Sequence, residues 1–514
     1  MTLPDNMIRP IELSITEDLP LNSGDYFRKA LIKPTGFREY DVRFLIEKDL
    51  NYQGLHILGA AFGTLLQCEY GVHKIVVGHD FRSYSQNVKN AFVIGLLSTG
   101  MNVIDIGLAV SPSLYFAQYH LNMEGGAMIT ASHNANGWTG VKLGYGFSKT
   151  LKPDGISKFK ETVYRGKYLS GKGSYSINSS MPEAYIQDAA NFAQTGRKLK
   201  VVVATGNGTA GLYTPEILRR AGHEVIEQHV PLDWNFPNFN PNPEDIAFLK
   251  DIGERVRETG ADFGVGIDGD GDRCGIVDEH GEEVFSDKIG LLIARSFAPK
   301  HPDSTFIVDV KSTGLFKIDE ILKANGCTTI YWKTGHSYLK SKVQEEKALA
   351  GFEKSGHMFF NHPYGRAYDD GSLSSLIFCN VLSHADKSVS GLLGELTKSY
   401  NSPTMAPRCS DNEKYNVVEE ITKIFQKDFD EGNKVAGVEI ESIITVNGAR
   451  VHYKDGSWGL VRASSNVPSL VVVGESFTTR RRLYDIIEDI ADRLKKFKDV
   501  GEWDQYLPPY PGED

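Results

Sequence analysis

The feature that most constrains the fold of this chain is a short apolar run that stops at polar, glycine-containing residues and then recurs along the sequence. The runs at 126–131, 263–267 and 349–352 have the length of strands, and segments with helical spacing lie between such runs. This alternation predicts mostly parallel sheets with right-handed crossovers. Ligands bind at the carboxyl ends of strands in such sheets, so the polar loops after these runs are the candidate functional segments.

The alternation occurs in three passes, as a structural repeat without clear sequence identity. The first pass predicts strands at 74–80, 102–107 and 126–131, with helices at 84–99 and 112–120. The second predicts strands at 198–204, 223–228 and 263–267, with helices ending near 221 and at 244–258. The third predicts strands at 305–310, 328–332 and 349–352. We therefore expect an α/β fold class.

The C-terminal part of the chain has a different pattern. It predicts, in order, a helix at 414–429, strands at 436–446, 449–453, 458–464 and 469–476, and a helix at 478–497. This order is α+β and indicates a small separate domain. We expect residues 1–30 to form an extension and the tail from 499 to be irregular. The expected domains are 1–178, 179–284, 285–405 and 406–514.

Composition restricts the partners and the compartment. The net charge is −10, which argues against a general nucleic-acid or anionic membrane surface. The five cysteines are scattered and form no C-x-x-C pair, as expected in a reducing compartment. No signal sequence or long apolar stretch is visible, so we expect a cytoplasmic protein.

The segment after the run 263–267 predicts a metal site. Asp268, Asp270 and Asp272 alternate with glycine, and carboxylates this close together repel one another without a counter-ion. Ligands that are all oxygen favour Mg²⁺ or Ca²⁺. An EF-hand is one alternative, but Arg273 stands where that loop requires glycine and the flanking segments are strands. A solvated acidic turn is the other alternative.

Ser132 follows the run 126–131, which is how α/β enzymes present a nucleophile, although Ser-His-Asn is also ordinary loop chemistry. The adjacent His133 suggests a triad. A loop serine beside a metal site suits phosphoryl transfer instead. The chain has no Walker sequence and no kinase glycine loop, so ATP is not the evident donor. A serine that itself carries the phosphoryl group removes that need.

Four motifs occur in a fixed order, one in each expected domain: Thr130-Ala-Ser-His-Asn134, Asp268-Gly-Asp-Gly-Asp-Arg273, Glu353-Lys-Ser-Gly-His357 and Arg462-Ala-Ser-Ser-Asn-Val-Pro468. Together they resemble the α-D-phosphohexomutases, the phosphomannomutase/phosphoglucomutase group in particular, over about residues 30–500. The resemblance implies three similar α/β domains with mixed, mostly parallel sheets and a C-terminal α+β domain, arranged around a central cleft with one loop from each domain.

The resemblance also implies a mechanism. Ser132 would carry a phosphoryl group and give it to a hexose 1- or 6-phosphate, which forms a hexose 1,6-bisphosphate. The bisphosphate turns over in the site and returns its other phosphate to Ser132. Mg²⁺ would bind to Ser132, Asp268, Asp270 and Asp272. The triad hypothesis is then discarded, because the general acid/base of the family corresponds to Lys142.

The remaining residues follow from matching positions in the family. The resemblance implies that the catalytic residues are Ser132, Lys142, Arg273 and His336. It implies substrate contacts at Tyr40, Arg43, Lys311, Glu353, Ser355 and His357. It implies that the non-reacting phosphate is bound by Arg462, Ser464, Ser465 and Asn466.

The chain departs from the family pattern at Ala135, usually proline, and at Ser337, commonly lysine. Phe44 follows Arg43 where glycine is frequent, and the phosphate loop reads Ser-Ser-Asn rather than Ser-Asn-Thr or Ser-Gly-Thr. None of these departures removes a group that the mechanism needs.

The implied function is interconversion of mannose 1-phosphate and mannose 6-phosphate, and also of the glucose phosphates. The alternatives are a phosphoglucomutase, a phosphoglucosamine mutase, a non-catalytic sugar-phosphate binder and a Mg²⁺-dependent phosphatase. We expect a small hexose phosphate as the partner, no nucleic acid or membrane, a hexose 1,6-bisphosphate as activator, and a monomer or dimer.

Overall fold

The computed structural model describes residues 13–14, 18–465 and 467–512. The chain folds as two compact units. The first comprises residues 1–286 and 355–389, and the second comprises residues 287–354 and 390–514. Within the described ranges, no helix combines the length and the apolar composition needed to cross a membrane.

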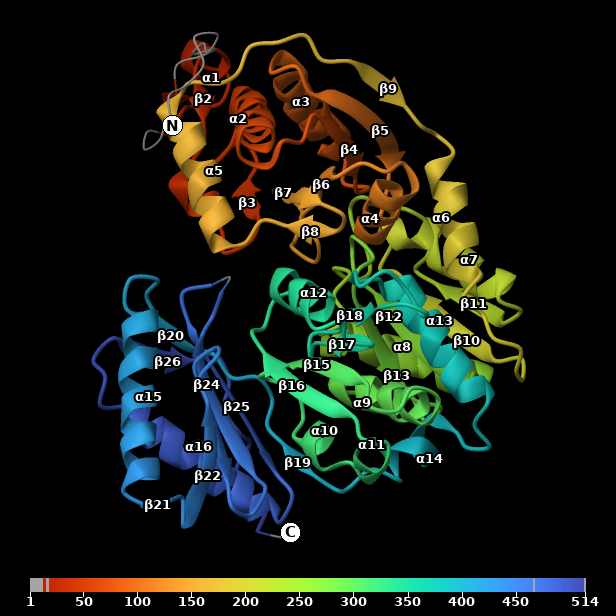
Figure 1. Cartoon of the computed structure of the whole chain (residues 1–514), viewed down its shortest axis with the longest axis vertical. Helices are drawn as coiled ribbons and strands as arrows, with labels where there is room; N and C mark the ends of the chain where they lie inside the picture. The colour runs from red at the N-terminus through yellow and green to blue at the C-terminus, as the bar shows by residue number, and fades with distance from the viewer. Residues whose placement is uncertain (1–12, 15–17, 466, 513–514) are drawn as a thin grey trace. The chain divides into compact units, whose positions relative to one another are not determined.

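The N-terminal part of the first unit is built on a mixed sheet with the strand order β3-β7-β6-β4-β5-β9 (Figure 1). Strand β4 runs parallel to β5 and β6, whereas β7 runs antiparallel to β6 and β3. The elements in chain order are β1 (Leu13–Ser14), α1 (Gly24–Arg28), β2 (Ala30–Leu31), η1 (Pro34–Gly36), β3 (Val42–Leu45), α2 (Tyr52–Tyr70), β4 (Lys74–His79), α3 (Ser85–Ser98), β5 (Asn102–Leu108), α4 (Ser111–His120), β6 (Gly125–Ile129), β7 (Trp138–Gly146), β8 (Lys149–Thr150), α5 (Pro153–Arg165), β9 (Tyr175–Ile177) and α6 (Met181–Ala190).

Helices cover both faces of this sheet. Ile75 and Val77 of β4 belong to a core with apolar residues of α2, α3 and α5. Val76 points to the other face, where it packs with residues of α4 and α6. Because successive strand residues face opposite sides, a strand covered on both faces has a continuous apolar stretch, which in β4 comprises residues 75–78.

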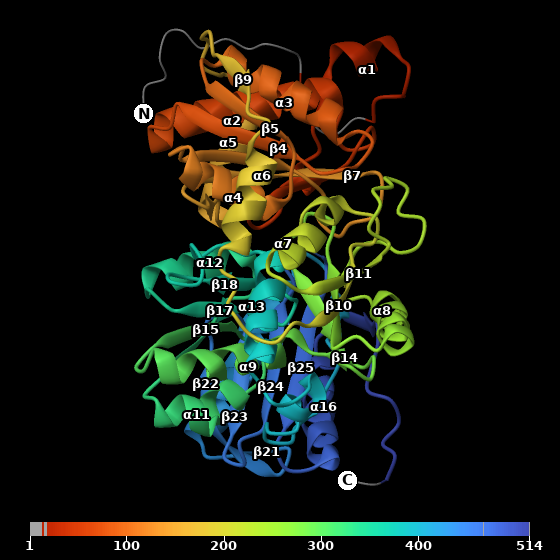
Figure 2. The same ribbon diagram turned by 90° about the vertical axis from the view of Figure 1, so that its right-hand side faces the viewer.

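The second sheet of the first unit has the order β11-β10-β12-β13-β14. Strand β10 is parallel to β11 and β12, and β12 to β14 form an antiparallel meander. Helix α8 covers one face of this sheet (Figure 2). Phe378 of α13 packs on Phe263 of β12. The elements are β10 (Lys200–Ala204), η2 (Thr209–Leu212), α7 (Thr214–Arg220), β11 (Glu224–Gln228), α8 (Ile246–Thr259), β12 (Phe263–Ile267), β13 (Cys274–Val277), β14 (Glu283–Val284), β18 (Met358–Phe360) and α13 (Gly371–Ser383).

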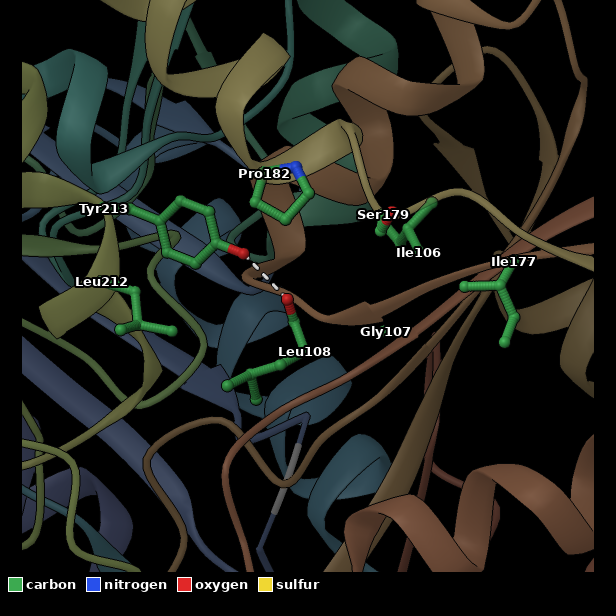
Figure 3. A pocket seen from close by; sticks show the side chains of 8 residues that line it. All are labelled: Ile106, Gly107, Leu108, Ile177, Ser179, Pro182, Leu212 and Tyr213. Atoms are coloured by element: carbon green, nitrogen blue, oxygen red, sulfur yellow. Dashed lines mark hydrogen bonds between the residues drawn. The ribbon is translucent and has the colours of Figure 1, made fainter.

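An apolar pocket lies where the two sheets of the first unit meet (Figure 3). The hydroxyl of Tyr213 donates to the carbonyl oxygen of Leu108 at 2.8 Å across this junction. The lining residues are Ile106, Gly107, Leu108, Ile177, Ser179, Pro182, Leu212 and Tyr213. The hydrogen bond ties the end of β5 to the segment that precedes α7.

The second unit combines a parallel sheet with an antiparallel one. In the parallel sheet β15 is flanked by β16 and β17, and the antiparallel sheet has the order β19-β25-β24-β23-β22-β21. Its elements are α9 (Ser286–Phe297), η3 (Ala298–Lys300), β15 (Thr305–Asp309), α10 (Leu315–Ile318), α11 (Glu320–Ala324), β16 (Thr328–Trp332), α12 (His336–Glu345), β17 (Ala350–Phe352), α14 (Val389–Leu393), β19 (Tyr400–Asn401), β20 (Pro407–Cys409), α15 (Lys414–Asp430), β21 (Lys434–Val435), β22 (Val438–Ile444), β23 (Ala449–Tyr453), β24 (Trp458–Ala463), β25 (Leu470–Ser476), α16 (Arg480–Leu494) and β26 (Val500–Trp503).

A buried arginine joins the two sheets of the second unit. Arg450 of β23 is completely buried, and its Nη1 donates to the carbonyl oxygens of Val310 at 2.6 Å and Ser312 at 2.7 Å. Its guanidinium lies 3.5 Å from the ring centroid of Trp458 and 4.2 Å from that of Tyr331. Cation–π contacts of this kind are strengthened when water is excluded.

The expected fold class, three α/β domains with mixed, mostly parallel sheets and a C-terminal α+β domain, is confirmed. The strand expected at 436–446 is present as β22, which begins at Val438 because Ala436 and Gly437 have positive φ angles of 48° and 83° and form the turn that joins it to β21. Two other parts of the chain differ from the expectation. The tail was expected to be irregular, but β26 pairs with β20. The segment 138–146 forms β7, which we did not expect as a strand.

Candidate active site

The aspartate loop after β12 is completely buried. One carboxylate oxygen from each of Asp268, Asp270 and Asp272 lies within 4.8 Å of the others. The Asp268 side chain accepts the backbone N–H of Asp272 at 3.0 Å and that of Arg273 at 3.2 Å. These bonds fold the loop back on itself, so the three carboxylates converge. The solvated-turn alternative fails because the loop has no exposure to solvent.

Ser132 approaches this loop from the end of β6. Its Oγ donates to Oδ2 of Asp268 at 3.1 Å, and its φ of 51° lies in the left-handed region. A Cβ at position 269 would lie 2.5 Å from the carbonyl oxygen of Ser132, so only glycine permits this contact. The structure therefore brings the candidate nucleophile and the candidate metal loop together.

Lys142 lies on β7, which runs antiparallel to β6 and pairs Lys142 with Met128. Its Nζ is 2.6 Å from Oδ2 of Asp270, and it also donates to Asp272. Asp270 accepts a second bond, from Oγ of Ser111, at 2.7 Å. Burial alone would lower the pKa of Lys142, but the Asp270 and Asp272 carboxylates raise it well above its ordinary value. Lys142 therefore carries its proton between two carboxylates.

The charges of this cluster match a divalent cation. Burial raises the pKa of Asp270, but the Lys142 ammonium, the Ser111 hydroxyl and the Arg43 guanidinium together hold that pKa below its ordinary value. Burial and the neighbouring Asp270 carboxylate raise the pKa of Asp272 to about 8. Among the residues that the structure describes, Oδ1 of Asp270 and Oδ1 of Asp272 are buried and accept no hydrogen bond. Buried oxygen ligands with unused acceptor capacity fit Mg²⁺.

Arg273 and His357 flank the aspartates. Nε of Arg273 donates to Oδ2 of Asp268 at 2.9 Å. Nδ1 of His357 lies 3.0 Å from Oδ2 of Asp369 and 3.8 Å from Oδ1 of Asp272. We expected His357 among the sugar contacts, and the structure places it beside the carboxylate cluster.

His133 lies beside the candidate nucleophile Ser132, as the discarded triad hypothesis would require. Its Nδ1 is 3.3 Å from Oγ of Ser132. Burial, together with the charges of Arg273 and Arg43, lowers the pKa of His133 well below its ordinary value. An imidazole held neutral in this way is a weak base, so the geometry does not restore the triad.

Two of the expected substrate contacts, Tyr40 and Arg43, come from the segment at the start of β3. Arg43 on β3 donates to the carbonyl oxygen of Thr130 and, through Nε, to Asp41 at 2.9 Å. Tyr40 is buried directly before it. Ser355 is partly exposed in the same unit.

The second unit gathers a different set of predicted residues. Glu353 after β17 accepts the backbone N–H of Gly335, which precedes His336. The Asp309 carboxylate accepts hydrogen bonds from the Oγ1 hydroxyl of Thr334 at 2.8 Å and from the backbone N–H of Lys354 at 3.2 Å. These bonds draw the loops after β15, β16 and β17 together, and the loop after β15 carries Lys311.

The motif expected to bind phosphate begins at the end of β24 and continues into the segment before β25. Nη1 of Arg462 donates to the carbonyl oxygen of Ala463 at 2.8 Å, and the backbone N–H of Ser464 donates to Ser469 at 2.9 Å. Ser465 is partly exposed, and Asn466 lies outside the described residues.

Sequence reasoning missed several residues of the site. Ser111 and Asp369 contact the cluster, and Asp80 and Arg82 hold the Ser132 loop. The available signal was the apolar run at 74–80, which ends in Asp80.

Family models match the chain in four consecutive segments: phosphoglucomutase/phosphomannomutase α/β/α domains I at 34–168, II at 183–281 and III at 285–400, and the C-terminal domain at 406–493. The fold and the site define an isomerase of the phosphohexomutase class. The chain belongs to the phosphoglucomutase/phosphomannomutase family, which confirms the resemblance.

Individual relatives agree with this membership. A phosphomannomutase/phosphoglucomutase of Pseudomonas syringae pv. tomato is 33% identical over 450 residues, which covers 87% of this chain and 92% of the relative. A phosphoglucomutase/phosphomannomutase of Thermococcus kodakarensis is 31% identical and covers 86% of this chain and 94% of the relative. A solved structure of a family protein from Burkholderia thailandensis has a TM-score of 0.81 at 28% identity and covers 91% and 98% of the two chains.

Proposed function

We propose that this enzyme interconverts mannose 1-phosphate and mannose 6-phosphate, and likewise the glucose phosphates, through a phosphoserine at Ser132 and a hexose 1,6-bisphosphate. The observation that carries the proposal is the hydrogen bond from Ser132 Oγ to Asp268, with Lys142 bound to Asp270 and Asp272 on the other side of the cluster. The relatives named for both sugars support the choice of substrates.

The residues that would hold Mg²⁺ are Asp268, Asp270, Asp272 and the phosphorylated Ser132. When bound, the ion supplies positive charge beside the phosphoryl oxygens and shares the carboxylates that otherwise keep the proton on Lys142.

The chain's own groups supply positioning and proton transfer. Lys142 would exchange a proton with the sugar hydroxyl that attacks or leaves, since its ammonium is the buried acid of the cluster. Arg273 would neutralise charge on the phosphoryl group in transit, because its guanidinium is already fixed by Asp268. Arg43 would contribute to the same anion site.

The remaining predicted residues are proposed to bind the rest of the substrate. Glu353 and Ser355 would hydrogen-bond the sugar hydroxyls, and Tyr40, Lys311, His336 and His357 would contact the substrate. Arg462, Ser464, Ser465 and Asn466 would bind the non-reacting phosphate through charge-assisted bonds. The domain boundaries of the sequence analysis, a cytoplasmic location and a monomeric or dimeric state belong to the same proposal.

A glucose-specific phosphoglucomutase is the second candidate. A relative named phosphoglucomutase from Neisseria gonorrhoeae is 30% identical over 466 residues, which covers 89% of this chain. The resemblance implies that subfamilies differ at the position of Lys354, between Glu353 and Ser355. This residue therefore does not distinguish a mannose enzyme from a glucose enzyme.

A coupled assay separates these functions. Mannose 1-phosphate, glucose 1-phosphate and glucosamine 1-phosphate are compared with Mg²⁺ and glucose 1,6-bisphosphate present, and the 6-phosphates are quantified. We expect turnover of the mannose and glucose substrates and loss of activity in Ser132→Ala. Release of inorganic phosphate as the main product would instead identify a phosphatase.

A further inference from the structure

A buried ion pair lies directly behind the Ser132 loop. Asp80 and Arg82 follow β4, and 1% of each side chain is exposed. The Arg82 guanidinium donates to Asp80. Its Nη2 also donates to the carbonyl oxygens of Ser132 at 2.9 Å and Asn134 at 2.6 Å. Arg82 therefore holds both ends of the segment 132–134.

Asp80 holds the residues that lead into the same segment. Its Oδ2 accepts hydrogen bonds from the Oγ1 hydroxyl of Thr130 at 2.8 Å and from the backbone N–H of Ala131 at 3.4 Å. Oγ1 of Thr130 in turn accepts the backbone N–H of Ser132 at 2.9 Å. The pair thus fixes the backbone before the serine through Asp80 and after it through Arg82.

This fixation matters because the Ser132 backbone is unfavourable by itself. A φ of 51° places Cβ near the following carbonyl in any residue except glycine. Such conformations persist where the surrounding structure imposes them, and they cluster at functional sites. From this conformation Oγ of Ser132 reaches Asp268, while the serine carbonyl faces Gly269 and Arg82.

We infer that Arg82, oriented by Asp80, is a positioning residue that keeps Ser132 in the left-handed conformation in which Oγ faces the aspartate loop. The inference rests on the proposed role of Ser132 as the phosphoryl carrier. Arg82 touches neither the reacting hydroxyl nor the aspartates of the metal loop, so it acts through the backbone of Ser132. Without it, the serine backbone loses the bonds that oppose relaxation to a negative φ.

A purely structural role is the competing explanation. Arg82 also lies 5.5 Å from the ring centroid of Phe236, so it contributes to packing between the two sheets of the first unit. The matched comparison is the ion pair of Lys89 and Asp105, whose side chains are 5% and 2% exposed. That pair bonds to Tyr175 and to the backbone of Gly107, away from the serine loop.

The experiment compares full-length Arg82→Met, Arg82→Lys and Lys89→Met with the wild-type enzyme. The thermal midpoint, kcat and KM for glucose 1-phosphate are measured at saturating Mg²⁺, and phosphoserine content is read from intact mass after incubation with glucose 1,6-bisphosphate. We expect Arg82→Met to lower kcat by about 100-fold, with KM changed by less than about 3-fold, because a displacement near 1 Å of a reacting group has this effect. We expect Arg82→Lys to recover part of kcat and Lys89→Met to lower the thermal midpoint with kcat retained.

The outcomes are separable. If Arg82→Met and Lys89→Met lower the thermal midpoint alike and both retain kcat, the positioning role is wrong. If Arg82→Met does not fold, Arg82→Lys decides: a wild-type kcat in that variant also overturns the inference. If the wild-type enzyme itself shows neither phosphoserine nor mutase activity, the proposed function fails first, and the thermal midpoints of the variants are then interpreted on their own.

Discussion

Gly269 sets the distance between the serine loop and the aspartate loop at the scale of single residues. A side-chain carbon there would lie 2.5 Å from the carbonyl oxygen of Ser132, and backbone atoms cannot give way as a flexible side chain can. Gly271 has a φ of 78°, and a side-chain carbon at this position would lie 2.7 Å from Cγ1 of Val110. Both glycines allow the aspartate loop to approach its neighbours closely enough for hydrogen bonds.

We predict that Gly269→Ala lowers kcat by about 10- to 100-fold, because the added methyl pushes Ser132 away from Asp268. The coupled mutase assay measures the change. Gly24→Ala is the matched control, since among the described residues a side-chain carbon at position 24 would meet no atom within 4 Å beyond its chain neighbours and its own helix backbone. Equal kcat values for the two variants would show that the contact has no role in the reaction.

At the scale of elements, the helix α13 begins with a buried carboxylate. Asp370 caps the helix by accepting the backbone N–H of Leu373 at 2.9 Å, and it also accepts the hydroxyl of Tyr185 at 2.9 Å. Burial raises the pKa of Asp370 to about 7, despite these donors. A carboxyl whose pKa is higher in the folded than in the unfolded protein binds more protons when folded.

This shift predicts a pH dependence of stability. The contribution of Asp370 is fully present below pH 4 and is lost as the pH rises towards 7, so the free energy of unfolding falls over that window by roughly 3 kcal/mol. Asp370→Asn retains a capping side chain and should flatten the slope. Urea unfolding at pH 5 and pH 7.5 tests this, with Asp245→Asn, which replaces the cap of α8, as control. An unchanged slope in Asp370→Asn would contradict the assignment.

The elements show which features of the sequence were informative. β4, β12 and β15 are apolar over most of their length, and each ends in or is followed directly by a polar residue, so period and composition sufficed to find them. β7 escaped because it contains glycines and a lysine, which depress strand propensity. Lys142 is nevertheless buried in that strand, since Asp270 and Asp272 bind its ammonium. In β7, contacts between residues more than a hundred positions apart in the sequence therefore outweigh the low strand propensity of the segment.

The site was predictable to a similar degree. The Asp268 loop and Ser132 carry dense local motifs, and the structure brings them together as expected. Asp369 and Arg82 are isolated polar residues in ordinary surroundings, and only the folded chain reveals their contacts. The position of His357 beside Asp272 was likewise invisible, because it depends on a segment that returns to the first unit.

At the scale of the whole molecule, the two units contain different parts of the candidate chemistry. The first unit contains every proposed metal ligand, and the second contains Lys311, His336, Glu353 and the Arg462 loop. Mg²⁺ should therefore stabilise the first unit directly, by binding its folded form alone.

We predict that Mg²⁺ slows hydrogen exchange in peptides covering 125–146 and 263–278, and leaves those covering 400–512 unchanged. Mass spectrometry of the enzyme with EDTA or with Mg²⁺ measures this. Asp270→Asn should abolish the protection, because it removes a charged ligand from the cluster. Protection of the second unit alone would place the cation elsewhere.

The position of Arg450 has a consequence for a ligand that must turn over in the site. Its guanidinium binds the carbonyl oxygens on either side of Lys311 and stacks on Trp458, which begins β24, the strand that carries Arg462. Arg450 therefore holds the loop of Lys311, proposed to contact the substrate, at a fixed distance from the loop of Arg462, proposed to bind the phosphate. A bisphosphate would contact the same two loops, at Lys311 and at Arg462, in both of its orientations. The distance between the groups of the ligand that these loops bind, rather than a movement of the loops, would then determine which sugars fit.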